Sequence, residues 1–178
     1  MDIRQRARQL GASKALIITK EQLVIEQAVR NACVENQCGH YDSNFMCPPH
    51  VGEISDFEEV LDEYSQGLLV QVKRDIKSLE DKEAILSLAG QLHQLVLAIE
   101  KEAKQQDYSR AKALSAGHCK LCEPCPINTG ADTCIKPDLA RPAMEAVGIN
   151  VVESCRRAGA PLEFLQHEVT WVGLILLK

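Results

Sequence analysis

The sequence predicts a single α+β domain, in which helices pack on a mixed or antiparallel sheet. Its length of 178 residues is typical of one domain. Apolar residues recur at helical spacing in some segments, and in others they alternate with polar residues or run together. Hydrophobic residues make up 46% of the chain, which is enough to build a core without help from a metal.

Helices are expected where a capping residue precedes apolar positions spaced by three or four. The longest follows a capping box at Ser78 and runs to about residue 105. Its apolar stripe consists of Ile85, Leu88, Leu92, Leu95 and Ile99. Other helices are predicted over 3–10, from a capping box at Thr19 to about 32, over 55–66, from Pro142 to Gly148, and over 150–159.

Strands are expected at four places between these helices. Residues 15–18 form a short apolar run, and over 67–73 apolar residues alternate with polar ones. Residues 109–116 give a weaker signal. The continuous apolar run 169–177 is typical of a strand in the interior of a sheet, and Trp171 within it is expected in the core.

Composition argues against two classes of partner. Aromatic residues make up only 4% of the chain, the formal net charge is −5, and no basic stripe is present, so nucleic-acid binding is not expected. The N-terminus lacks the apolar core of a signal peptide, and the run 169–177 is too short to span a bilayer. The protein is therefore expected to be cytoplasmic, without membrane contact.

Eight cysteines are the main functional signal. In a reducing compartment, clustered cysteines bind metals more often than they form disulfides. Three lie in a loop over about 33–50, four lie in a second loop over about 117–138, and Cys155 stands alone. A lone cysteine on an apolar helix is usually a core residue, so Cys155 is not expected to be a ligand.

The second loop contains Cys119, Cys122 and Cys125 at C-x2-C-x2-C spacing, followed by Cys134. Thiolates at this spacing can occupy three corners of a cubane, and a fourth cysteine completes a [4Fe–4S] site. Zinc is the alternative, but the overlapping C-x2-C pairs strain a single tetrahedral site. The spacing therefore favours an iron–sulfur cluster bound by these four residues.

The first loop contributes Cys33, Cys38 and Cys47, at a wider and less diagnostic spacing. Three arrangements are open. The loop can hold its own cluster with a fourth position open or filled by another group, it can hold one completed by Cys155 or a histidine, or the two loops can share clusters. The first arrangement is favoured, and an iron without a protein ligand there can bind a substrate.

Three neighbouring residues are candidates to act on a cluster without binding it. Tyr41 can donate a hydrogen bond to a cluster sulfur, and His40 lies in the same loop. Lys120 can offset cluster charge. The common alternative for all three is packing or a solvent-exposed position.

The cysteine pattern resembles a known family. Cys33, Cys38, Tyr41 and Cys47-Pro48-Pro49, followed far downstream by Gly117, Cys119, Cys122, Cys125 and Cys134, are similar to the motif of the prokaryotic predicted metal-binding proteins of domain-of-unknown-function family 2284. The segments 141–146 and 148–151 also match. The resemblance implies metal binding in a bacterium or archaeon, often an anaerobic one.

Three functions remain open from the sequence. One or two [4Fe–4S] clusters can transfer electrons to or from a redox partner protein. A three-cysteine cluster can instead act on a small-molecule substrate, or zinc can staple a binding module that has no redox activity. The sequence predicts no oligomeric state.

Overall fold

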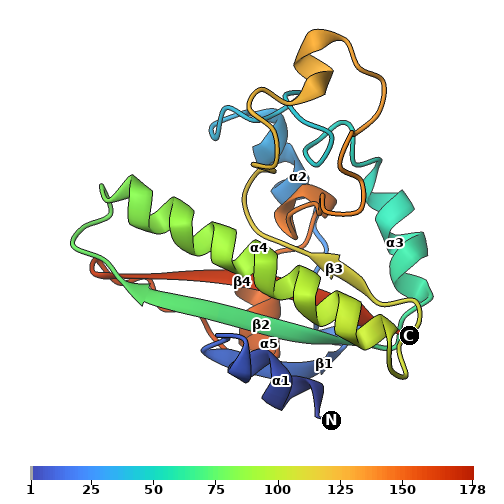
Figure 1. The fold of residues 1–178 in the computed structure, drawn as a ribbon, viewed down its shortest axis with the longest axis vertical. Helices are drawn as coiled ribbons and strands as arrows, with labels where there is room; N and C mark the ends of the chain where they lie inside the picture. Colours follow the sequence, from blue (N-terminus) through green and yellow to red (C-terminus); the bar gives the residue numbers. More distant parts are fainter. Residues whose placement is uncertain (1) are drawn as a thin grey trace.

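The computed structural model describes residues 2–178 and confirms the α+β fold. Its sheet contains β1 (Lys14–Thr19), β2 (Gln66–Asp75), β3 (Lys112–Leu114) and β4 (Glu168–Leu177), in the order β1-β2-β4-β3 (Figure 1). Every neighbouring pair is antiparallel, so the antiparallel alternative is correct.

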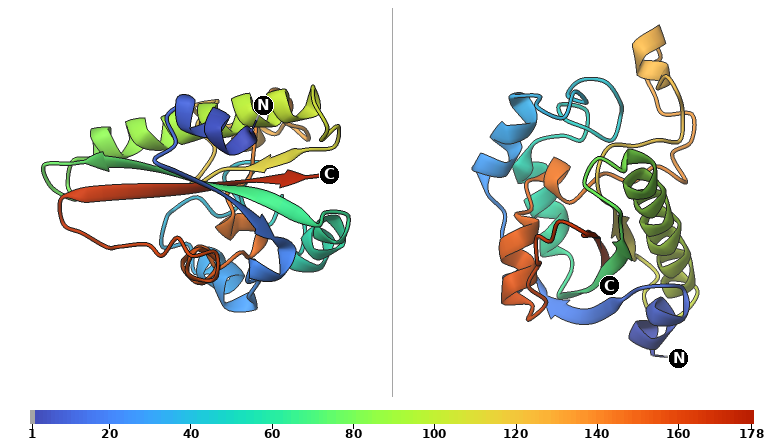
Figure 2. Two further views of the ribbon diagram at one scale, coloured as in Figure 1. Left: turned by 90° about the horizontal axis from the view of Figure 1, so that it is seen from below. Right: turned by 90° about the vertical axis from the view of Figure 1, so that its left-hand side faces the viewer.

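Helices cover both faces of this sheet, which gives three layers (Figure 2). On one face lie α1 (Ile3–Gln9) and α4 (Lys82–Lys104). On the other lie α3 (Ile54–Asp62) and α5 (Val151–Arg157), with α2 (Gln27–Val34) beside them. Among the described residues, none of the helices combines the length and the apolar character that crossing a bilayer requires.

The two central strands bury side chains on both faces. In β2, Leu68 and Val70 belong to the core under α1 and α4, whereas Leu69 belongs to the core under α3 and α5. In β4, Ile175 belongs to the core under α1 and α4, and Leu174 belongs to the core under α3 and α5. Because both faces are covered, β4 appears in the sequence as a nearly continuous apolar run, and β2 contains three consecutive apolar residues, 68–70.

One predicted helix is interrupted and another is reduced to a turn, because their residues pair with distant backbone. The helix predicted from Thr19 to about 32 is present from residue 27 onward as α2. The capping box at Thr19 opens only a 3-10 turn, Lys20–Gln22, since Ile25 forms a β-bridge with Ile149. After Pro142 only a 3-10 turn forms, Glu145–Val147. There the Ser115 N–H donates to the Pro142 carbonyl oxygen at 2.8 Å, which holds this segment extended.

Other differences concern where elements begin. The longest helix is capped by Asp81, whose side chain accepts from the Ala84 N–H at 3.2 Å, and not by Ser78. The capping box of α3 pairs Glu53 with Asp56 instead of Ser55 with Glu58. The weak strand 109–116 is reduced to the three residues of β3, which pair with the end of β4.

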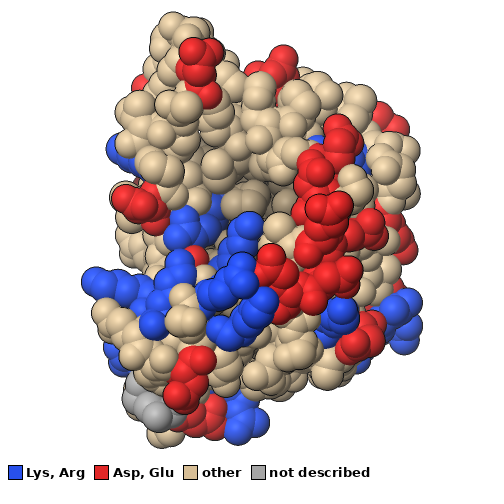
Figure 3. All heavy atoms as spheres, turned by 90° about the vertical axis from the view of Figure 1, so that its right-hand side faces the viewer, with Lys and Arg blue, Asp and Glu red and all other residues tan. Residues whose placement is uncertain are grey.

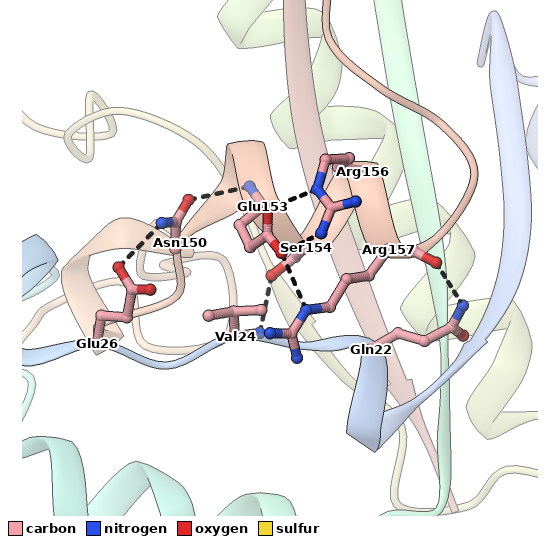
Figure 4. A network of polar contacts seen from close by, with 8 residues as sticks. All are labelled: Gln22, Val24, Glu26, Asn150, Glu153, Ser154, Arg156 and Arg157. Carbon is pink, nitrogen blue, oxygen red and sulfur yellow. Dashed lines mark hydrogen bonds and ion pairs between the residues drawn. The ribbon is translucent and has the colours of Figure 1, made fainter.

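Polar contacts join α5 to the segment that leads into α2 (Figure 4). The Asn150 side chain caps α5 by accepting from the Glu153 N–H at 3.0 Å, and its amide donates to Glu26 Oε2 at 3.0 Å. The Val24 N–H donates to Ser154 Oγ at 2.9 Å. These contacts fix the start of α2 and therefore the position of the first cysteine loop.

Gly173 marks the closest approach of β4 to α4. A Cβ at this position would lie 2.7 Å from Val96 Cγ1 and 3.2 Å from the Leu114 carbonyl oxygen. We expect Gly173→Ala to lower the free energy of unfolding by about 1–3 kcal/mol through overpacking, as measured by urea denaturation. Gly90→Ala is the matched control, because that position in α4 is exposed and open. The control should gain about 0.5–1 kcal/mol, and equal effects of the two changes would contradict the packing described.

Candidate metal centre

The two cysteine loops lie together at one end of the molecule, at the top of Figure 1. The Asn128 side-chain amide of the second loop donates to the Ser43 carbonyl oxygen of the first at 2.9 Å. The rings of His40 and His118, one from each loop, stack with their centroids 3.5 Å apart. One fold therefore brings together two loops that are distant in sequence.

The three cysteines of the first loop line one cavity of about 730 Å³. Cys33 lies near the end of α2, and Cys38 and Cys47 follow in a series of turns. Asp42 adopts a positive φ of 55°, and its N–H donates to the Pro48 carbonyl oxygen at 2.8 Å. This contact folds the loop back on itself and directs its cysteines to the same space.

Asn44 is a buried polar residue of the first loop that sequence reasoning missed. It is 4% exposed, and its side-chain amide donates to Cys47 Sγ at 3.2 Å. Its Oδ1 accepts from the Met46 N–H at 3.0 Å, which fixes the orientation of the amide. A donor held on the sulfur in this way stabilises a thiolate. No feature of the sequence distinguishes Asn44 from an ordinary turn asparagine.

Arg30 fastens α2 to the rest of this site. It is 5% exposed, and its guanidinium donates to the carbonyl oxygens of Ala146 and Gly52. A planar fork can reach two carbonyls that belong to different segments. Arg30 therefore holds the turn Glu145–Val147 and the end of the first loop against the helix that carries Cys33.

The second loop places its four cysteines around a separate, narrow cavity of about 10 Å³. Phe45 and Met46 of the first loop close this cavity. The Lys136 ammonium donates to the Leu121 carbonyl oxygen at 2.7 Å, and the Lys136 N–H approaches Cys134 Sγ at 3.4 Å. This cavity holds far less open space than that of the first loop, and the four cysteines around it are partly exposed.

The thiols within each group influence one another electrostatically. Burial raises the pKa of Cys47 to about 11; the Asn44 amide opposes this shift, and the neighbouring thiols Cys38 and Cys33 add to it. Burial also raises the pKa of Cys119, and its own group adds to that shift. Because metals bind the thiolate, loading either site must release protons.

The three candidate neighbours take different positions. Tyr41 and His40 line the cavity of the first loop, and their action on a cluster stays a prediction. Lys120 instead lines a different cavity, apart from the thiols. Burial lowers the pKa of Lys120, and burial followed by His40 lowers that of His118 to about 4.

Two further residues line the cavity of the first loop that sequence reasoning did not place there. Glu145 comes from the turn after Pro142, and its Oε2 is buried with no hydrogen-bond partner among residues 2–178. Burial raises the pKa of this carboxyl. Trp171 also lines the cavity; it is partly buried and packs against the core under α1 and α4, where the sequence placed it. The indole N–H donates to the Ile85 carbonyl oxygen at 3.1 Å.

Cys155 lies apart from both groups of thiols. It is 0% exposed and belongs to the core beneath α3 and α5. The Gln71 amide approaches its sulfur at 3.8 Å. Its burial agrees with the prediction that this cysteine is a core residue.

A third hollow lies on the other side of Phe45 and Met46, with a volume of about 640 Å³. Basic residues Lys104, Arg110 and Lys112 line it. Figure 3 shows Lys and Arg side chains gathered beside a hollow on this side of the molecule, next to a band of Asp and Glu. The second cysteine group therefore lies close to a charged surface.

The donor sets of both groups suit thiophilic metals, since thiolates bind zinc and iron–sulfur clusters. Seven of the eight cysteines line two neighbouring cavities, three in one and four in the other. Within residues 2–178, no three His, Cys, Asp or Glu side chains converge closely enough to hold a single ion. The assignment of the seven cysteines as ligands stays a prediction.

Comparison with known proteins gives one match. No curated protein and no solved structure matches the chain. Residues 16–177, which include both cysteine loops and all four strands except the first two residues of β1, match a family described as predicted metal-binding proteins. The chain therefore belongs to the family of predicted metal-binding proteins DUF2284.

Proposed function

We propose that this protein is an iron–sulfur protein with two [4Fe–4S] clusters, one of which binds a small-molecule substrate. Cys119, Cys122, Cys125 and Cys134 would hold the first cluster, and Cys33, Cys38 and Cys47 would hold the second. In the three-cysteine site one iron has no protein thiolate. An iron with an open position can bind and polarise a substrate atom, as an open zinc site does.

The observation that carries this proposal is the cavity on which the three cysteines converge. Its volume of about 730 Å³ lies within the range of ligand pockets, roughly 300–1,000 Å³. The four-cysteine cavity is far smaller. A complete set of thiolates therefore lies where there is no room for a substrate, and an incomplete set lies where there is room.

The contact between the two loops supports different roles for the two clusters. The stacked rings of His40 and His118 and the Asn128–Ser43 hydrogen bond keep the two sites adjacent. Electrons from a redox partner protein would reach the four-cysteine cluster first and pass to the substrate site. A cytoplasmic, reducing and often anaerobic setting belongs to the same proposal, because it keeps these thiols available for metal.

Metal analysis of the anaerobically purified protein tests the proposal. We expect about eight iron and eight sulfide per chain, as two [4Fe–4S] clusters require, together with broad visible absorption and an EPR signal on reduction. A colourless, air-stable protein that contains zinc and no iron would rule the proposal out. Four irons per chain with both loops needed for them would show a single shared cluster.

Zinc in the second loop is the alternative with an observation in its favour. Its open space of about 10 Å³ is closer to the size of one ion than to that of a cubane, although no three of the described side chains converge closely enough to hold an ion. The overlapping spacing of Cys119, Cys122 and Cys125 argues against it, because tetrahedral zinc usually takes two separate C-x2-C pairs. Under this alternative the same metal analysis gives one zinc for the second loop and leaves the first loop to be accounted for separately.

Asn44 provides a more local test of the three-cysteine site. We expect Asn44→Leu to weaken metal binding by the first loop by about 10- to 100-fold, the usual effect of losing a partner that supports a ligand. The reason is the loss of the amide that donates to Cys47 Sγ at 3.2 Å. Iron retained during titration with a chelator measures the effect. Asn31→Leu is the matched control, because Asn31 is exposed on α2, its side chain accepts only from the Gln27 amide, and it does not line the cavity. Loss of iron from the first loop in both variants would contradict the assignment.

A further inference from the structure

The cavity of the first loop contains one polar atom that the protein itself does not satisfy. Glu145 lines the cavity, and its Oε2 is buried without a hydrogen-bond partner among the described residues. Buried polar atoms in native proteins nearly always have a partner, because losing water without gaining a hydrogen bond is costly. The position of Glu145 is also maintained, since Arg30 holds the adjacent Ala146 carbonyl oxygen. The Glu145 side chain thus lines an open cavity, while one of its carboxyl oxygens is turned away from solvent and unsatisfied. The last torsion of a glutamate is broad, so rotation of the carboxyl can present either oxygen to a ligand in the cavity.

The rest of the cavity limits what that ligand can be. Much of the wall is apolar and includes Val29, Ala32, Pro48, Ala146 and Trp171. Among the described residues that line it there is no lysine or arginine. The imidazoles of His40 and His118 are therefore the only basic side chains that an anionic ligand would meet among the described residues of the wall, and it would lie beside an acidic side chain and three cysteines. The chemistry favours an uncharged molecule with an apolar body.

We propose that the cavity binds a small, uncharged, largely apolar molecule through a hydrogen bond from its amide or hydroxyl group to the carboxyl group of Glu145. The inference deepens the proposed function and rests on it in one respect only, namely that this ligand is the substrate of the open iron. Binding itself requires only the cavity and the carboxyl. A ligand N–H or O–H can donate to a carboxyl oxygen whether the group is ionised or not.

Cyclohexanecarboxamide is a suitable probe, because it joins an amide to an apolar ring and absorbs little ultraviolet light. Trp171 is the only tryptophan of the chain and lines the cavity, so its fluorescence reports occupancy. In the anaerobically purified full-length protein we expect a saturable change with a dissociation constant of about 1 mM or tighter. Cyclohexanecarboxylate, which has the same shape and a negative charge, should bind at least about tenfold more weakly.

Substitution of Glu145 tests its part in binding. We expect Glu145→Leu to weaken carboxamide binding at least about tenfold, equivalent to about 1.4 kcal/mol. Glu145→Gln keeps the shape and an acceptor oxygen, so it should retain most of the affinity. Glu59→Leu is the control, because Glu59 is exposed on α3 and does not line the cavity. Leucine at position 145 removes an unsatisfied polar atom, so the variant should still fold, which circular dichroism checks.

The outcomes separate this inference from the proposed function. Failure of the carboxamide to saturate, equal affinity for the carboxylate, or unchanged affinity in Glu145→Leu would overturn the inference. Iron is measured on the same samples. Selective carboxamide binding to protein whose first loop holds no iron would support the inference and refute the proposed function. An open iron site without carboxamide binding would support the proposed function and refute the inference.

Discussion

Replacing Cys119 or Cys47 by alanine is expected to remove different halves of the protein's iron. Cys119 lines the cavity of the second loop and Cys47 that of the first, so each change should abolish one cluster and leave the other. Iron per chain should fall from about eight to about four in either variant. EPR of the reduced protein should also simplify, because two adjacent clusters broaden each other's signals and one alone does not.

Cys155→Ala is the matched control for this pair. It removes a thiol from the core beneath α3 and α5, away from both cavities, so the full iron content should remain. The double variant Cys119→Ala with Cys47→Ala should lose all iron. If either single change alone empties both sites while circular dichroism shows a folded protein, the two loops serve one shared cluster, and the two-site proposal is wrong.

Replacing Arg30 by leucine is expected to damage the substrate site and the fold together. The change leaves the carbonyl oxygens of Ala146 and Gly52 without their charged donor. Hydrogen bonds to charged groups contribute roughly 1.5–3 kcal/mol each, so we expect a loss of about 3 kcal/mol or more in the free energy of unfolding. Urea denaturation of the metal-free protein measures it. The first loop should also lose its iron, since α2 carries Cys33.

Two further variants give this prediction its controls. Arg30→Lys keeps the charge but loses the planar fork, so it should satisfy one carbonyl and fall between the wild type and Arg30→Leu. Arg156→Leu removes an exposed arginine that pairs with Glu153 on α5 and should leave both the iron content and the unfolding curve unchanged. Wild-type stability and iron content in Arg30→Leu would show that the two hydrogen bonds from Arg30 do not position the site.

The parts of the fold that the sequence predicted well are those with local signals. The apolar stripe of α4, the alternation in β2 and the continuous apolar run of β4 are each visible within one stretch of sequence. The helix that is interrupted after Gln22 and the one reduced to a turn after Pro142 differ from expectation for a shared reason. The backbone near Ile25 pairs with Ile149, and Pro142 accepts a hydrogen bond from Ser115. Capping patterns carry no information about such distant partners.

The same distinction applies to the candidate site. The two groups of cysteines were visible because each lies within a short stretch of sequence, and their grouping in space follows it. Glu145 and Trp171 reach the first loop's cavity from distant segments, and neither stands in a motif that predicts this. Asn44 is close in sequence, but its contact with the Cys47 sulfur depends on the conformation of the turn.

Mössbauer spectroscopy of anaerobic protein enriched in a Mössbauer-active iron isotope examines the proposed open iron itself. In the proposal, the cluster held by Cys33, Cys38 and Cys47 has one iron without a protein thiolate, facing the cavity. We expect one iron among about eight to have distinct parameters, which change when cyanide is added. This feature should disappear in Cys47→Ala and persist in Cys119→Ala. Indistinguishable, fully thiolate-bound irons that do not respond to cyanide would rule out the open iron.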